Sequence, residues 1–286
     1  MIEESKELQA HFDRVVHKDS GRFLEAIPKS LNSLRMSNQE FRKALLLRLH
    51  AKVYSAPKHF DCICKSKAKQ KKDETTTVDF YGRHLLCCPV GNDRHVRHDA
   101  LKYALGDLFR RAGLHIDVEP RRAFPDQHSR KRPDITIYNS NLHRGSTVHL
   151  DITVVAAHSS ESTEAALIRA SQAKERKYAD SCSDSKTKFI PTVFEVHGAT
   201  TAEVRSLIDS AIVAAHERSN GAIDLATLQR HWKARLSTVL AKGNGQLLHR
   251  RLDAILSRHQ QTPSASDCVL TTEDELALPV DTWSSC

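Results

Sequence analysis

The sequence predicts an α/β protein, because strand-like and helix-like segments alternate through its middle. Three short stretches at residues 115–119, 134–138 and 147–155 are largely alternating or β-branched, and turn-forming residues separate them. Segments with helical spacing lie on either side of the three strands, and a fourth strand is predicted at residues 189–197. The predicted order of the core is therefore helix, three strands, helix, strand.

Residues 1–60 are predicted to form a helical N-terminal segment. Its first part, residues 1–25, is a charged helix with an apolar stripe consisting of Leu8, Phe12, Val15 and Val16. A second helix is predicted to begin after Ser37, because Glu40 lies three residues further on and completes a capping box. The apolar residues that recur at helical spacing in this second helix are Phe41, Ala44, Leu45 and Leu49.

Residues 61–93 predict a zinc-binding segment. Four of the seven cysteines fall between Cys62 and Cys88, which suits a metal site in a reducing compartment better than a disulfide framework. Two thiolates one residue apart, then a His and a Cys three residues apart, can close a tetrahedral site across the loop between them. The predicted ligands are Cys62, Cys64, His84 and Cys88, with Cys87 as an alternative to Cys88. The other interpretation is that these cysteines are small buried apolar residues.

Residues 94–220 contain the predicted sheet and its helices. A helix from residue 94 to about 112 ends at Gly113, and its predicted buried side consists of Leu101, Ala104, Leu105 and Leu108. For His95 and His98 at its start, a structural or phosphate contact is favoured over a role as ligand or base. A second helix is predicted from about residue 161 to 180, and a third over residues 201–217. Pro191 favours an edge position, or the start of its strand, for the fourth strand.

Residues 221–260 predict two C-terminal helices, residues 225–240 and 246–259, separated at Gly243-Asn244-Gly245. Trp232 and Leu236 in the first of them are assigned to the core in preference to a base-stacking surface. Residues 261–286 are rich in Ser, Thr, Pro and acids, which is typical of a disordered acidic tail.

Charge is distributed unevenly along the chain. The net charge is +8, but residues 262–286 contain five acids and no Lys or Arg, so the remaining residues carry a net charge of +13. A basic body suggests a polyanionic partner such as nucleic acid, although many basic surfaces are only solvated. The sequence has no apolar run near eighteen residues, and the segment MIEESKELQA is charged. We therefore expect neither a membrane span nor a secretory signal, and an intracellular protein.

Three acids lie near the ends of the predicted strands. Glu119 closes the first strand before Pro120, and Asp134 opens the second after Pro133. On the third strand, alternation places Asp151 on the face opposite that of Leu150 and Ile152. Carboxylates at neighbouring strand ends can hold Mg²⁺, which takes oxygen ligands. The alternative for each acid is a solvated turn residue.

The combination Arg132-Pro133-Asp134, sixteen intervening residues, then Asp151-Ile152-Thr153 resembles the signature of the PD-(D/E)xK nuclease superfamily. Within this superfamily, the sequence most resembles the restriction-like endonuclease domain at the C-terminal end of some non-LTR retrotransposon proteins. The order Cys, Cys, His, Cys also resembles the zinc knuckle that precedes that nuclease. The resemblance covers the chain from about Cys62 to Glu217.

The resemblance implies a restriction-endonuclease-like core in which Asp134 and Asp151 are metal ligands and Glu119 is a candidate third ligand. One departure concerns the catalytic lysine, because Thr153 occupies the position two residues after the second acid. In the retrotransposon branch the lysine lies on the next helix, where Lys174 and Lys177 are the candidates here. Either of them taken alone is also explained as a solvated lysine in the last turns of a helix.

The implied function is a Mg²⁺-dependent DNA endonuclease that nicks target DNA and leaves a 3′ hydroxyl to prime reverse transcription. Its implied partners are DNA and, as a further candidate, the RNA of the element, and its implied location is the nucleus. A polymerase domain would lie elsewhere or be lost. Two alternatives are a catalytically inactive, retroelement-derived nucleic-acid-binding module and a purely structural or interaction protein.

Overall fold

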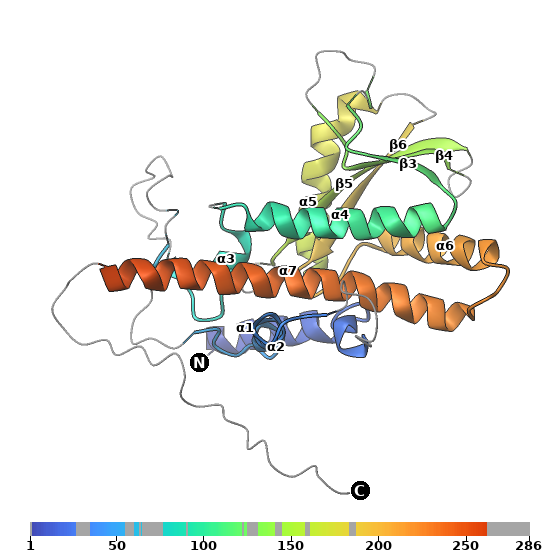
Figure 1. The fold of residues 1–286 in the computed structure, drawn as a ribbon. Coiled ribbons are helices and arrows are strands. Elements are labelled where there is room, and N and C mark those ends of the chain that lie inside the picture. Colours follow the sequence, from blue (N-terminus) through green and yellow to red (C-terminus); the bar gives the residue numbers. More distant parts are fainter. Residues whose placement is uncertain are drawn as a thin grey trace, which may run out of the picture.

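The structure is a computed structural model that describes residues 2–26, 35–54, 60–62, 64, 77–89, 91–121, 123–124, 131–140, 145–157, 161–182 and 187–261. The predicted acidic tail and most of the lysine-rich loop between Cys64 and His84 lie outside these residues. Within them the chain is mixed α/β, with a four-stranded mixed sheet, a two-stranded pair and seven α-helices (Figure 1).

The four-stranded sheet consists of β3 (His115–Val118), β4 (Ile135–Ser140), β5 (Ser146–Val155) and β6 (Thr187–Glu195), in that spatial order. The pairs β3–β4 and β4–β5 are antiparallel, whereas β5 and β6 run parallel. A parallel pair needs a crossover connection, and helix α5 (Thr163–Tyr178) supplies it. Strand β6 is an edge strand, as Pro191 predicted, because proline cannot donate to a second neighbour.

Helices cover both faces of the sheet (Figure 1). The first face packs on α4 (Asp93–Arg111), α6 (Ala202–Arg218) and α7 (Leu225–Gln261), and the core between them includes Leu105, Ile135, Leu150 and Trp232. The second face packs on α5, where Leu167 and Ala170 contact Val193. The order α4, β3, β4, β5, α5, β6 is the predicted one, and the predicted buried side of α4 is confirmed.

The segment that was predicted to bind zinc is built from short elements. Strand β1 (Phe60–Asp61) pairs with β2 (Thr77–Val78), and the short helix α3 (Arg83–Cys87) follows. Two 3₁₀ turns complete the described chain, η1 (Arg22–Glu25) and η5 (Ala179–Ser181). No described helix has both the length and the apolar character that a membrane crossing requires.

The prediction of two separate C-terminal helices is wrong, because α7 is one continuous helix of 37 residues. Its glycines allow close packing and do not interrupt the helix. A Cβ atom at Gly243 would lie 2.6 Å from Cγ of Arg97, and one at Gly245 would lie 2.9 Å from Cα of Glu40. Neighbouring helices therefore occupy the space that any larger side chain would need.

The N-terminal helices pack differently from the prediction. In α1 (Ile2–Val16), the apolar residues Leu8, Phe12 and Val16 are more than half exposed, whereas His11 and Arg14 are buried. These two polar side chains find backbone partners: His11 Nε2 lies 2.8 Å from the Arg48 carbonyl, and Arg14 donates to the Glu161 carbonyl. Hydrogen bonds to other segments therefore decide which side of α1 is buried.

In α2 (Asn38–Arg48) the predicted capping box is confirmed, since Ser37 and Glu40 exchange hydrogen bonds between side chain and backbone. Its predicted apolar face is only partly buried. Ala44 is buried, but Phe41 and Leu49 are exposed, and the second buried position is Leu47.

Candidate metal and catalytic site

The register of β4 and β5 places Asp134 beside Asp151. Ile135 pairs with Leu150, the Asp134 N–H donates to the Leu150 carbonyl at 2.8 Å, and the Ile152 N–H donates to Asp134 Oδ2 at 2.5 Å. Continuing this antiparallel register by one residue sets Asp134 opposite Asp151, whose side chain lies on the face away from Leu150. The two predicted aspartates therefore lie at facing positions of neighbouring strands, and Asp151 is only 4% exposed.

Helix α5 brings three side chains to Asp151. Lys174 forms an ion pair with Oδ2, and Lys177 Nζ lies 3.4 Å from Oδ1. The Tyr178 hydroxyl donates to Oδ1 at 2.6 Å and lies 2.7 Å from the Arg132 carbonyl. Burial and the Asp151 carboxylate raise the pKa of Tyr178, so the phenol keeps its proton. Both candidate lysines thus reach the predicted acid.

Glu119 is held apart from the two aspartates. It has a left-handed backbone with φ of 54°, and its N–H donates to the Asp134 carbonyl at 2.9 Å. Its side chain forms an ion pair with Lys102, a lysine that is 1% exposed and also donates to Asp99 at 2.7 Å. Burial opposes the charge on Lys102, but these two carboxylates outweigh it and raise its pKa. The structure therefore places Glu119 beside a buried ammonium.

His98 is a site residue for which the sequence favoured a structural or phosphate contact. Its Nε2 lies 3.0 Å from Asp134 Oδ2, and its Nδ1 lies 3.1 Å from Asp99. Burial lowers the pKa of His98, but the hydrogen bonds to the two carboxylates outweigh burial and raise it overall. The signal in the sequence was the His-Asp pair at the start of α4. The contact between His98 and Asp134 could have been predicted only by knowing that the start of α4 meets β4.

The second candidate site is the cysteine cluster. The ligand atoms of Cys62, Cys64, His84 and Cys88 all lie within 4.8 Å of one another, and these side chains could hold a metal ion. Cys62 Sγ lies 3.5 Å from Cys88 Sγ, and Cys64 Sγ lies 3.4 Å from His84 Nε2. Cys87 is exposed. The geometry therefore favours Cys88 over Cys87 as the fourth ligand.

Local hydrogen bonds position His84 for this cluster. Asp79 accepts from the backbone N–H groups of Tyr81, Arg83 and His84, which sets the start of α3. Burial raises the pKa of the Cys62 thiol. A bound cation would offset that effect and favour the thiolate form. Among the residues that the structure describes, this cluster is the one group of three or more such side chains with ligand atoms this close together.

Arginines connect the cysteine cluster to the core. Arg251 of α7 donates to the carbonyls of Leu85 and Cys88 at 3.0 and 2.8 Å, and Arg97 of α4 donates to the Leu86 carbonyl at 3.2 Å. These guanidinium groups satisfy carbonyls at the end of α3 that have no helical partner. The cluster is therefore fixed to the same helix, α4, that carries His98.

No protein-family model matches this chain, and neither does any curated protein. The functional assignment must therefore come from the motif and from the geometry of the two sites.

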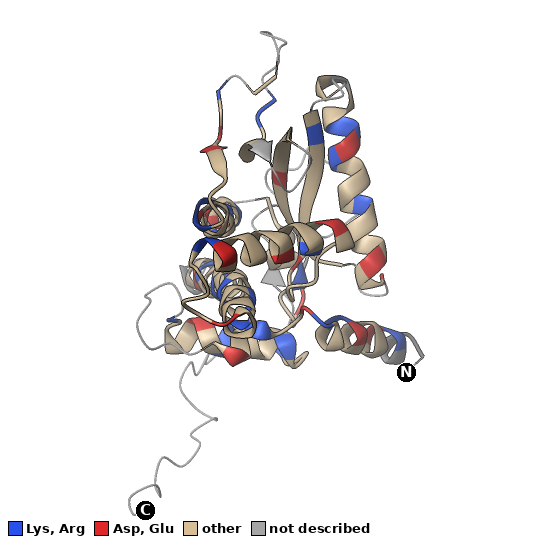
Figure 2. Ribbon diagram, turned by 90° about the vertical axis from the view of Figure 1, so that its right-hand side faces the viewer, with Lys and Arg blue, Asp and Glu red and all other residues tan. Residues whose placement is uncertain are grey.

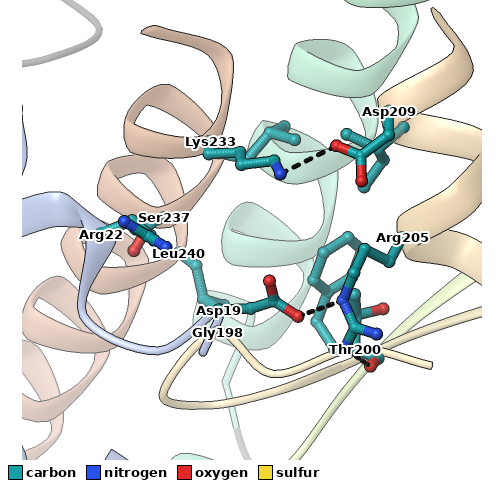
Figure 3. Close-up of a pocket in the computed structure, with 12 residues that line it drawn as sticks. Asp19, Arg22, Gly198, Thr200, Arg205, Asp209, Lys233, Ser237 and Leu240 are labelled. Atoms are coloured by element: carbon teal, nitrogen blue, oxygen red, sulfur yellow. Dashed lines mark hydrogen bonds and ion pairs between the residues drawn. The ribbon is translucent and has the colours of Figure 1, made fainter. Parts of the chain in front are cut away.

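A cavity near η1, α6 and α7 is a poor alternative site (Figure 3). Its charged residues are already in ion pairs: Asp19 accepts from Arg205 at 2.6 Å, Lys233 lies 2.9 Å from Asp209, and Arg22 donates to Glu25 at 2.8 Å. The remaining lining includes Phe194, Leu236 and Leu240. The cavity contains none of the predicted acids, lysines or cysteines.

Proposed function

We propose that this protein is a metal-dependent DNA endonuclease with a PD-(D/E)xK restriction-like core, and that it nicks target DNA for a non-LTR retrotransposon. The observation that carries this proposal is the pairing of Asp134 with Asp151 across β4 and β5, with Lys174 and Lys177 reaching Asp151 from the next helix. The element order of the core supports the same assignment.

The donor set suits a hard cation. Asp134 and Asp151 would hold one or two Mg²⁺ through carboxylate oxygens, with Glu119 as a third ligand if it leaves Lys102. When bound, Mg²⁺ polarises the scissile phosphate and lowers the pKa of the attacking water. Lys174 or Lys177 orients that water and offsets charge that develops in the transition state. A 3′ hydroxyl product would follow from attack that expels the 3′ oxygen.

The partner would be DNA, with element RNA as a further candidate and the nucleus as the location. The chain outside its acidic tail is strongly basic, and Lys and Arg lie on α5 beside the strands (Figure 2). Such a surface attracts phosphate without sequence preference. Three thiolates and one imidazole form a donor set typical of structural Zn²⁺, so we assign Zn²⁺ to the cysteine cluster.

A specific observation keeps one alternative open. Both oxygens of Asp151 are contacted by lysines, so protein cations occupy the surroundings in which Mg²⁺ would bind. In a retroelement-derived module that binds nucleic acid without cleaving it, these ion pairs would be permanent. Such a module would bind DNA with a strong salt dependence and would show no turnover.

A plasmid-nicking assay with Mg²⁺ tests the proposal. We expect supercoiled DNA to be converted to the open circle by the wild-type protein, and Asp134→Asn and Asp151→Asn to abolish this while DNA binding is kept. Asp117→Asn is the matched control, because Asp117 is an exposed acid of the same sheet that accepts from Tyr138. Nicking by both site variants at the wild-type rate would remove Asp134 and Asp151 from the mechanism.

A further inference from the structure

We infer that His98 is a positioning residue that orients the Asp134 carboxylate for the bound cation. The inference deepens the proposed function, because it concerns how that cation site is held. Two neighbours of Asp134 contact the same oxygen of its carboxylate. The Ile152 N–H donates to Oδ2 at 2.5 Å, and His98 Nε2 lies 3.0 Å from the same oxygen. Both contacts engage Oδ2, so we assign Oδ1 as the oxygen that would bind the cation.

Asp99 fixes the imidazole of His98. His98 Nδ1 lies 3.1 Å from Asp99 Oδ1, and that oxygen also accepts from Lys102 Nζ at 2.7 Å. Lys102 is 1% exposed and is itself held by Glu119, so it is a rigid anchor for Asp99. Both ring nitrogens of His98 lie within hydrogen-bonding distance of carboxylate oxygens, and a ring nitrogen that carries a proton donates to its carboxylate. The ring is therefore held at both ends.

The two aspartates are supported from opposite sides of the sheet. Helix α5 contacts Asp151 through Lys174, Lys177 and Tyr178, whereas α4 contacts Asp134 through His98. Without His98, the Ile152 N–H would be the remaining hydrogen-bond donor to the Asp134 carboxylate among the described residues, and the carboxylate could then rotate away from Asp151. Partners that orient a metal ligand typically contribute 10- to 100-fold in metal affinity.

The experiment measures Mn²⁺ binding to the full chain, by electron paramagnetic resonance of free Mn²⁺, in parallel with plasmid nicking. His98→Ala should raise the Mn²⁺ dissociation constant about tenfold or more. His98→Gln should restore much of the affinity, because its amide nitrogen can reach the position of Nε2 and donate to Asp134. His98→Asn places its amide near the position of Nδ1, so it should behave like alanine. His95→Ala is the control, since His95 is an exposed histidine of the same helix.

The outcomes separate this inference from the proposed function. If the wild-type protein nicks DNA and all four variants bind Mn²⁺ as it does, the role of His98 is disproved and the nuclease assignment stands. If the wild-type protein does not nick DNA but the affinity for Mn²⁺ still follows the order glutamine above asparagine and alanine, His98 positions a cation in a protein that is not a nuclease. Equal loss in the glutamine and asparagine variants would mean that His98 has only a packing role.

Discussion

Asp151 is nearly fully buried, and the two lysines that reach it lie one helical turn apart on α5. They differ in their surroundings, since the side chain of Lys174 is 23% exposed and that of Lys177 is 47% exposed. The closer and less exposed ammonium is held more firmly beside the carboxylate. Lys174 is therefore the stronger candidate for the lysine that acts in cleavage.

We expect Lys174→Met to lower the nicking rate by about 10²-fold, and Lys177→Met to lower it much less, because a single ammonium can stand beside the attacking water. Single-turnover nicking at saturating Mg²⁺ measures both. Arg176→Met is the matched control, since Arg176 is an exposed cation of the same helical turn. The assignment to Lys174 fails if Lys177→Met is the slower variant.

Glu195 at the end of β6 gives the fold a dependence on pH. Burial raises the pKa of Glu195 from 4.5 to about 7, although hydrogen bonding and Arg14 act against this. Between these values the folded protein holds a proton that the unfolded chain has released. The stability that this proton provides is complete below pH 4.5 and is lost as pH rises through about 7.

Glu195→Gln should remove this dependence, since an amide does not titrate. The free energy of unfolding of the wild-type protein, relative to the variant, should fall by on the order of 3 kcal/mol between about pH 4.5 and 8. Urea unfolding at several pH values measures it. Burial also lowers the pKa of His149 to about 4, which makes stability rise with pH in the acid range. The effect of His149 is common to the wild-type protein and the variant, so it cancels in the difference between their free energies of unfolding. A difference that does not change with pH would contradict the prediction.

At the scale of elements, α7 joins the parts of the molecule together. It contacts α2, α3, α4, α6 and η1, and its glycines lie where α2 and α4 come closest. Asn244 between those glycines accepts from Arg97 and donates to the Val196 carbonyl, at 2.7 Å each. The segment that was predicted to separate two helices is therefore closely packed against α2 and α4.

We expect Gly245→Ala and Gly243→Ala to destabilise the protein, although glycine to alanine inside a helix usually stabilises it by about 0.5–1 kcal/mol. Gly245→Ala should be the more harmful, because its Cβ would meet the backbone of Glu40, whereas a Cβ at Gly243 would first meet the side chain of Arg97. Gly106→Ala in α4 is the matched control, since its Cβ would meet nothing closer than 3.4 Å. The midpoints of urea unfolding compare the stabilities of the three variants. If Gly245→Ala is more stable than the wild-type protein, α2 can shift to make room for the methyl group.

At the scale of the whole molecule, the cysteine cluster packs into a second core of its own. Leu85 and Leu86 of α3 join Leu248 and Leu252 of α7 in this core, together with the cysteines of the cluster. A metal ion at the cluster would therefore stabilise α3 and, through Arg97 and Arg251, its attachment to α4 and α7.

We expect the purified protein to hold about one zinc per chain, and removal of the metal by a chelator to lower the melting temperature. Elemental analysis and thermal unfolding measure the two effects. Cys64→Ser should lose zinc and stability, whereas Cys87→Ser, the exposed cysteine beside the cluster, should retain both. Zinc loss in Cys87→Ser with retention in Cys88→Ser would reverse the choice of the fourth ligand.

The sequence by itself determined the elements whose signals are local. Alternation over a few residues places strands β3, β4 and β5, because the side-chain period of a strand needs no distant partner. The capping box at Ser37 likewise depends on residues within one turn, and Gly113 ends α4 by its own backbone conformation with φ of 77°. Spacing also predicted the four residues of the cysteine cluster, whereas the two aspartates were predicted from their positions at strand ends and from the resemblance to the nuclease signature.

Only the tertiary structure decided which partners those residues have. His98 meets Asp134 across 36 positions of the chain, and Gly245 meets Glu40 across a still longer interval. The packed side of α1 depends in the same way on the carbonyls of Arg48 and Glu161. The physical reason is that hydrogen bonding and steric exclusion act over a few ångströms, so their outcome depends on segments that the fold brings together and that local sequence cannot identify.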